Sequence, residues 1–202
     1  MFMWLSRLFS RRLEASPEAF EAFLGGRAAF VAQKTVLDYC EVKAGRAARA
    51  MFADKDFQAA LRHCRWQTYA GALQDVTAMA EAWLRPHAPG REPELAAALA
   101  RIAGRIAAAA PVPADERAAL EAAQDTLPRH LATLQEAPPR SADRLPLLAE
   151  APLLATLPVH PDQRVGETPA IRGALRFHVV SSQQEMERAF DPPALAARLL
   201  AG

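Results

Sequence analysis

The sequence is poor in cysteine, has no excess of charge of either sign, and contains no apolar run long enough to cross a membrane. Cys40 and Cys64 are its only cysteines, too few for a disulfide framework, which favours a reducing, cytoplasmic location. With 24 basic and 23 acidic residues, the chain has no global field to hold nucleic acid, so nucleic-acid binding is not expected. Charge or proline interrupts every apolar run before the ~18 residues of a membrane-spanning helix. Peripheral contact with a membrane is left open.

Motifs of the common enzyme classes are also missing. The sequence has no GxGxxG, GxxxxGK[ST], GxSxG or HExxH pattern and no ExxH pair of the di-iron type. The five histidines are scattered without an i to i+4 pair, so neither a metal site nor a cofactor is predicted. These absences favour a non-catalytic protein, and an enzyme of unfamiliar type remains the alternative.

What the sequence does contain is helical periodicity. Hydrophobic residues make up 51% of the 202, and many are alanines, which favour helix. The order Ser16-Pro17-Glu18 is typical of a helix start, and Gly25-Gly26 predicts a stop. Apolar spacing predicts further helices over about 28–51, 54–85 and 93–110, and another from 115 that is interrupted at Pro128.

The last third of the chain has a different character. Prolines at 138, 139, 146, 152, 158, 161 and 169 exclude a long helix over 137–169. The leucines of this segment predict that it wraps against the helical body. Residues 171–190 fit either a strand or a helix, and helix is preferred because a lone strand has no partner for its backbone. A short helix over 193–200 is expected to end the chain.

Together these patterns predict an all-α fold. We expect a bundle of five to seven helices over residues 1–136, with residues 137–202 forming a proline-rich wrap and a C-terminal helix or strand packed on the same domain.

One carboxylate interrupts the apolar face of the helix predicted over 54–85. Asp75 falls in its apolar sector, and a buried carboxylate needs a partner or a proton. Either the two central helices enclose a polar pocket for a small molecule, or Asp75 makes an internal ion pair with Lys43 or Arg65. The ion pair is the preferred interpretation. The candidate ligand-binding residues are Gln33, Cys40, Lys43, Arg65, Thr68 and Asp75.

The two cysteines each lie in an apolar helical sector. Cysteine there acts more often as a small buried hydrophobe than as a redox centre. We therefore expect both thiols to be buried and inert.

The N-terminal segment is amphipathic and unusually apolar for a chain end. Its composition suits a membrane interface or the groove of a protein partner, and packing on its own bundle is the equal alternative. The candidate contact residues are Phe2, Trp4, Leu5, Arg7, Phe9 and Arg11. The leading functional hypothesis is thus a binding or accessory protein that meets a partner or membrane through this segment. The alternative is a small-molecule-binding protein or unfamiliar enzyme that uses the polar pocket.

Overall fold

The computed structural model describes residues 13–202, and its regular structure is helical. This confirms the all-α prediction. Short 3₁₀ turns occupy Gly45–Ala47, Arg85–His87 and Pro161–Arg164. The helices are α1 (Pro17–Ala44), α2 (Ala48–Ala53), α3 (Lys55–Leu84), α4 (Glu92–Ala109), α5 (Arg117–Gln135), α6 (Glu150–Thr156), α7 (Thr168–Ala189) and α8 (Pro192–Ala201).

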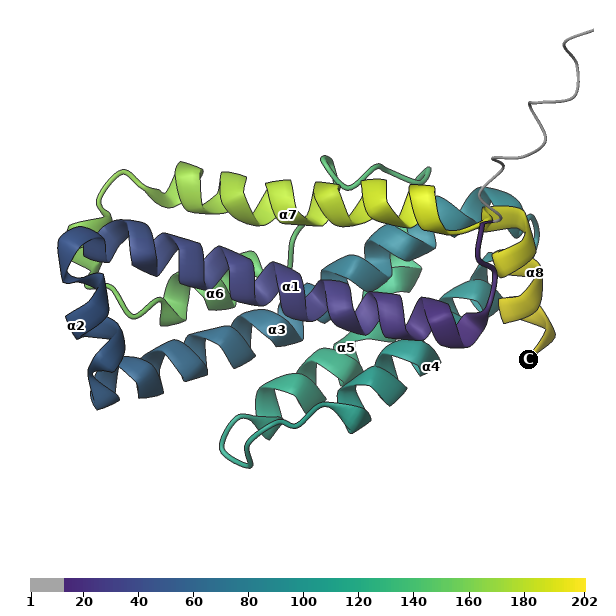
Figure 1. The fold of residues 1–202 in the computed structure, drawn as a ribbon. Helices are drawn as coiled ribbons and strands as arrows, with labels where there is room; N and C mark the ends of the chain where they lie inside the picture. Colours follow the sequence, from purple (N-terminus) through teal and green to yellow (C-terminus); the bar gives the residue numbers. More distant parts are fainter. Residues whose placement is uncertain (1–12) are drawn as a thin grey trace, which may run out of the picture.

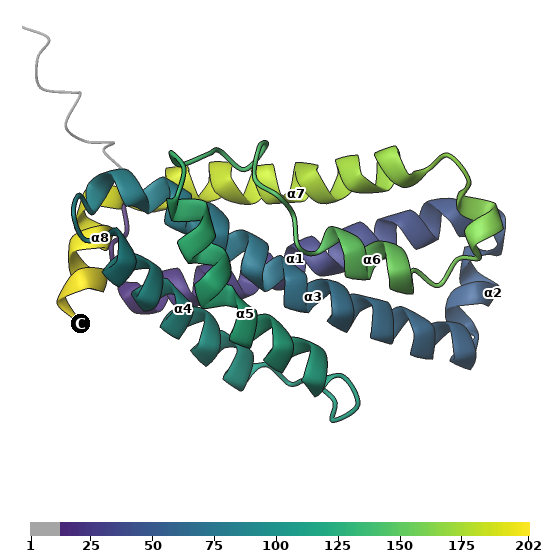
Figure 2. The ribbon, with the colours of Figure 1, turned by 180° about the vertical axis from the view of Figure 1, so that it is seen from behind.

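The two longest helices form the frame of the molecule. Helices α1 and α3 run side by side and are joined at one end by α2 (Figure 1). Helix α7 lies along α1 on one side, and the α4–α5 hairpin packs on the other side. From behind, α6 covers α3, and α8 closes the end opposite α2 (Figure 2). The second half of α3 is therefore surrounded by other elements.

The second half of α3 forms the centre of the core. Every residue from Thr68 to Ala82 is buried, so this stretch has no solvent face. A helix buried all round cannot place polar groups in water, and each must find a partner inside the protein. The side-chain amide of Gln74 donates to the carbonyl oxygen of Ala123 at 2.7 Å, and the Thr77 hydroxyl donates to the carbonyl of Leu73.

A buried ion pair closes the C-terminal end of α3. The guanidinium of Arg85 donates to both carboxylate oxygens of Glu81, at 2.8 and 2.6 Å. It also donates to the carbonyl oxygens of Leu134 and Ala137 at the exit of α5. The pair satisfies two charges that the core could not otherwise hold, and it fastens the start of the wrap to α3.

Local sequence signals set several helix starts as predicted. The Ser16 hydroxyl accepts the N–H of Ala19 at 3.1 Å, with Pro17 in the first position of α1. The Asp54 carboxylate accepts the N–H of Phe57 at 2.8 Å and starts α3. Both are side-chain caps of the expected kind.

Three predicted boundaries were wrong. Helix α1 passes through Gly25-Gly26 without a stop, because packing of its buried face outweighs a penalty of about 1 kcal/mol per glycine. The helix predicted over 28–51 ends at Ala44, where Gly45 takes a φ of 49° that suits glycine. Helix α5 continues through Pro128, which lies inside it.

The proline-rich segment and the C-terminus largely follow the prediction. Residues 137–167 contain only the short α6 and one 3₁₀ turn, and Leu145, Leu153 and Leu157 are buried against the body. Residues 171–190 are helical, within α7. The N–H of Glu14 donates to the carbonyl of Ala189, so the chain entering α1 is tied to the end of α7.

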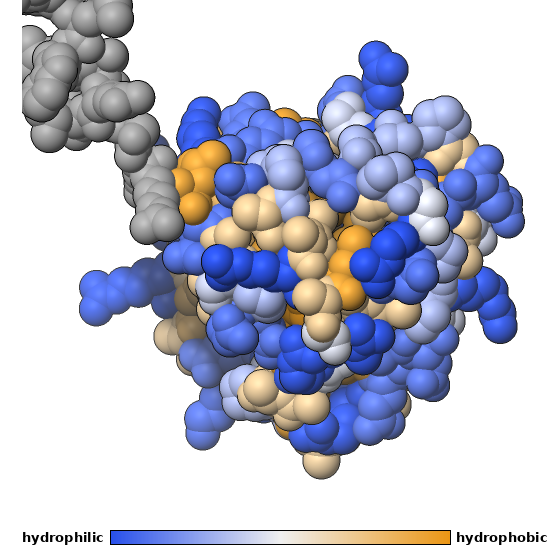
Figure 3. Space-filling model, turned by 90° about the vertical axis from the view of Figure 1, so that its right-hand side faces the viewer, coloured by the Kyte–Doolittle hydropathy of each residue, from blue (hydrophilic) through white to orange (hydrophobic). Residues whose placement is uncertain are grey.

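Among residues 13–202, no helix is both long and apolar enough to span a bilayer. Hydrophilic side chains cover most of the face seen from the α8 end, and strongly hydrophobic groups appear there only in small separate areas (Figure 3). That face offers no broad apolar patch.

Candidate functional site

A groove runs between α1, α3 and the C-terminal end of α4. Its volume is about 610 Å³. We call it the α1–α3–α4 groove. Its lining residues are Glu21, Ala22, Gly25, Gly26, Ala29, Ala32 and Gln33 from α1, Arg62, Arg65, Trp66 and Tyr69 from α3, and Ile106, Ala109, Ala110 and Pro111 from α4 and the residues after it.

Small residues on α1 create the space. Ala22, Gly26, Ala29 and Gln33 follow the spacing of one helical face, and the first three have little or no side chain. A Cβ added at Gly26 would meet no atom within 4 Å, whereas one at Gly25 would lie 3.3 Å from Ile106. The open side of α1 is thus hollow where a larger residue would have filled it.

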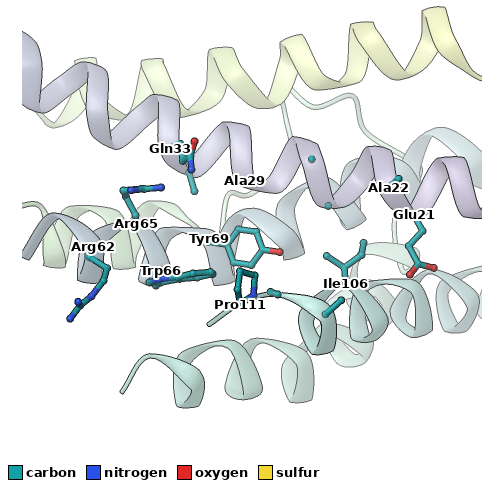
Figure 4. A pocket seen from close by; sticks show the side chains of 15 residues that line it. Glu21, Ala22, Ala29, Gln33, Arg62, Arg65, Trp66, Tyr69, Ile106 and Pro111 are labelled. Atoms are coloured by element: carbon teal, nitrogen blue, oxygen red, sulfur yellow. The ribbon is translucent and has the colours of Figure 1, made fainter. Parts of the chain in front are cut away.

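The opposite wall is aromatic. The rings of Trp66 and Tyr69 lie 5.5 Å apart and perpendicular to each other. Tyr69 is 8% exposed, and burial raises the pKa of its hydroxyl. In Figure 4, Tyr69 and Pro111 lie at the middle of the groove and Ile106 lies toward one end. This middle can contact an apolar or aromatic group.

The two ends of the groove differ in polarity. Arg62, Arg65 and Gln33 gather at one end, and Glu21 lies at the other (Figure 4). The Nε atom of Arg65 is buried, and no residue of the described chain accepts a hydrogen bond from it. Glu21 differs, because its carboxylate lies 2.6 Å from the Arg105 guanidinium. The arginine end is therefore positively charged.

Of the six predicted ligand-binding residues, the groove brings together Gln33 and Arg65. The other four do not line it, so the residues predicted for one polar pocket are divided between the groove and other parts of the fold. Cys40 and Thr68 are buried, and the Thr68 hydroxyl lies 3.9 Å from the sulfur of Cys64. Lys43 pairs with Glu167 at 2.6 Å, so the predicted ion pair of Asp75 with Lys43 was wrong.

Asp75 faces the core as predicted, but its partners are backbone amides. It is 1% exposed, and its carboxylate accepts the N–H groups of Leu148 at 2.7 Å and Ala149 at 3.1 Å. Burial raises the pKa of Asp75 to about 7, against the two N–H donors and Arg176, which lower it. Since Arg65 lies in the groove without an ion pair to any described carboxylate, the predicted Asp75–Arg65 pair was also wrong.

Lys43 belongs to a separate cluster at the start of α7. The carboxylate of Glu167 accepts hydrogen bonds from the Lys43 ammonium and the Tyr39 hydroxyl, both at 2.6 Å. These two donors hold the pKa of Glu167 below its usual value. The cluster links α1 to α7, which is a structural role.

The cysteines are buried thiols, as expected. Cys40 and Cys64 are both 0% exposed. Burial raises the pKa of Cys40 to about 12 and also raises that of Cys64. A thiol with a raised pKa is a poor nucleophile at neutral pH, so neither is placed for redox or covalent chemistry.

One polar cluster was missed by the sequence analysis. The Glu116 carboxylate, at the start of α5, lies 2.8 Å from Nδ1 of His63 and accepts from the Gln67 side chain at 3.0 Å. Glu116 is 4% exposed. Its partners lie about 50 residues earlier in the chain, so spacing along the sequence gave no signal for it. The cluster joins α3 to α5 and does not line the groove.

The small-residue face of α1 was missed as well. A signal for it was present, because the glycine and alanine positions that line the groove recur at helical spacing. Interpreting Gly25-Gly26 as a helix stop hid that face. Ile106 and Pro111 had no signal of their own, since only the tertiary fold brings them to α1.

The residues predicted to contact a membrane or partner, from Phe2 to Arg11, lie outside the described residues. Within residues 13–202, no group of three or more His, Cys, Asp or Glu side chains is placed to hold a metal ion. No protein-family model, curated protein or solved structure matches this chain.

Proposed function

We propose that this chain is a non-catalytic binding protein and that the α1–α3–α4 groove is its ligand site. The groove itself is the observation behind the proposal. Its volume of about 610 Å³ falls in the range of roughly 300–1,000 Å³ common for small-ligand sites. Such sites are mostly apolar with a few polar groups that fix orientation, and the groove has that composition.

The placement of the buried carboxylates supports binding over catalysis. Asp75, Glu81 and Glu116 are each nearly inaccessible to solvent. Each is engaged inside the fold, by backbone amides, by Arg85 and by His63 respectively. None of the three lines the groove, so a ligand there would meet no buried carboxylate.

Probe binding to a blocked groove tests the proposal. Phenylnaphthylamine is a neutral apolar dye whose fluorescence rises in an apolar site. We expect the native protein to bind it. Gly26→Leu should weaken binding about tenfold or more, which corresponds to about 1.4 kcal/mol, because the new side chain fills the open space above Gly26.

Gly173→Leu is the matched control. Gly173 also lies inside a helix, in α7, and a Cβ there meets no atom within 4 Å. Both substitutions remove a helical glycine and should raise the melting temperature, but only Gly26→Leu should weaken dye binding. Equal dye binding by the two folded variants, or no binding to the native protein, would contradict the proposal.

The contact with a protein partner or membrane that the sequence predicts for residues 1–12 is a separate proposal. It rests on the amphipathic composition of that segment. It is compatible with a ligand site in the groove, since a binding protein can also dock on a surface.

A further inference from the structure

The chemistry of the groove changes along its length. At one end Arg65 from α3 lies beside Gln33 from α1, with Trp66 next to them (Figure 4). The opposite end contains Ile106, Ala22 and Glu21, whose carboxylate is paired with Arg105 (Figure 4). A ligand that fits both ends must itself be polar at one end and apolar along the rest.

Arg65 supplies an uncompensated positive charge. Its guanidinium makes no ion pair or hydrogen bond with any residue from 13 to 202, and its Nε atom is buried. The neighbouring Arg62 differs, because its guanidinium lies 3.6 Å from the carboxylate of Asp115. Arg65 is thus the arginine at this end that has no acidic partner among the described residues.

A buried donor without an acceptor opposes folding, because it gives up water and gains nothing in return. Guanidinium groups recover this loss best with a planar or tetrahedral oxyanion, to which they donate two parallel hydrogen bonds. Carboxylate, sulfonate and phosphate groups share that geometry. The Nε atom of Arg65 is closed to solvent, so an anionic group on the ligand would be bound by the terminal nitrogens of the guanidinium. They too have no acceptor in the described chain.

We propose that the ligand is an amphipathic anion with its charged group against Arg65 and its apolar body along Trp66 and Tyr69 toward Ile106. This inference rests on the proposed function, since it names the chemical class of the ligand in the same groove. The perpendicular rings of Trp66 and Tyr69 provide one flat and one edge contact for an apolar body. Glu21 at the other end is paired with Arg105 and does not call for a second cation.

Two dyes with a common core test the anionic group. Anilinonaphthalene sulfonate has the phenylnaphthylamine skeleton with a sulfonate added. We expect Arg65→Gln to weaken binding of the sulfonate about tenfold or more, the loss expected for a charge-assisted hydrogen bond, and to leave binding of the neutral dye within about twofold. Arg188→Gln is the matched control, because Arg188 is an exposed arginine of α7.

Competition on the native protein provides a second test that needs no variant. Decanoate and decanol have the same chain length and differ in charge. We expect decanoate to displace the sulfonate dye at a lower concentration than decanol does. This measurement decides the matter even if Arg65→Gln fails to fold.

The outcomes separate this inference from the proposed function. If neither dye binds the native protein, or if Gly26→Leu leaves both unaffected, the groove is not the site. If the groove binds both dyes but Arg65→Gln weakens the binding of both equally, the ligand is not an amphipathic anion. The same follows if decanol competes as well as decanoate. In either case the groove still stands as the binding site.

Discussion

Gly71 and Asp75 lie one turn apart on α3 and meet the same piece of chain, Leu148–Ala149. A Cβ at Gly71 would lie 2.5 Å from the Cα of Ala149. One turn later, the Asp75 carboxylate accepts the N–H groups of both residues. The absence of a side chain at Gly71 and the carboxylate acceptor of Asp75 together hold the start of α6 against the centre of the core.

Gly71→Ala should therefore destabilise the protein by about 1–3 kcal/mol, the usual range for overpacking a core. The new methyl group would meet backbone atoms, which cannot rotate away as a side chain could. Urea unfolding followed by circular dichroism measures the change. The matched control is Gly104→Ala in α4, where a Cβ meets nothing within 4 Å. The higher helix propensity of alanine should raise the free energy of unfolding of this variant by up to about 1 kcal/mol. If the two variants are equally stable, the backbone at Ala149 has shifted to accommodate the new methyl group.

The ionisation of Asp75 should make stability depend on pH. Its pKa is raised from 3.8 to about 7 in the folded protein, so the folded state binds this proton more tightly than the unfolded chain does. The free energy of unfolding should fall as the pH rises from about 4 to about 7 and then level off. The shift sets an upper limit of about 4 kcal/mol on the effect.

Comparison with Asp75→Asn isolates this contribution, because asparagine does not titrate. The stability of the native protein minus that of Asp75→Asn should decrease between pH 4 and 7. Urea unfolding at several pH values provides the measurement. Asp125→Asn, which changes an exposed aspartate of α5, is the control. A difference that is flat, or that rises across this window, would show that the two N–H donors outweigh burial.

Deletion of residues 1–12 should lower cosedimentation with vesicles of anionic lipid or capture of a protein partner. The segment combines an apolar face with Arg7, Arg11 and Arg12, and each arginine near an anionic surface contributes on the order of 1 kcal/mol. The melting temperature of the shortened chain is measured beside it. Unchanged binding with an intact fold contradicts the contact, and a lowered melting temperature with unchanged binding places the segment on its own bundle.

Short-range signals were the reliable part of the sequence. Ser16 and Asp54 start α1 and α3 because their side chains cap N–H groups only three residues away. The prolines of 137–169 exclude a long helix because proline lacks an N–H. The burial of Asp75 followed from its place among apolar residues at helical spacing. These effects depend on neighbours along the chain, so the sequence was enough.

The sites depended on distant residues. Asp75 has its partners in a segment more than 70 residues later, and Lys43 pairs with Glu167, 124 residues later. Neither therefore formed the ion pair expected from the helical wheel. Packing carried α1 through Gly25-Gly26 and turned that predicted stop into one wall of a groove. Helical propensity and capping are local, so the sequence by itself determined the class of fold and several helix starts. Which buried polar groups meet, and where a hollow remains, is decided only when helices far apart in the chain pack together.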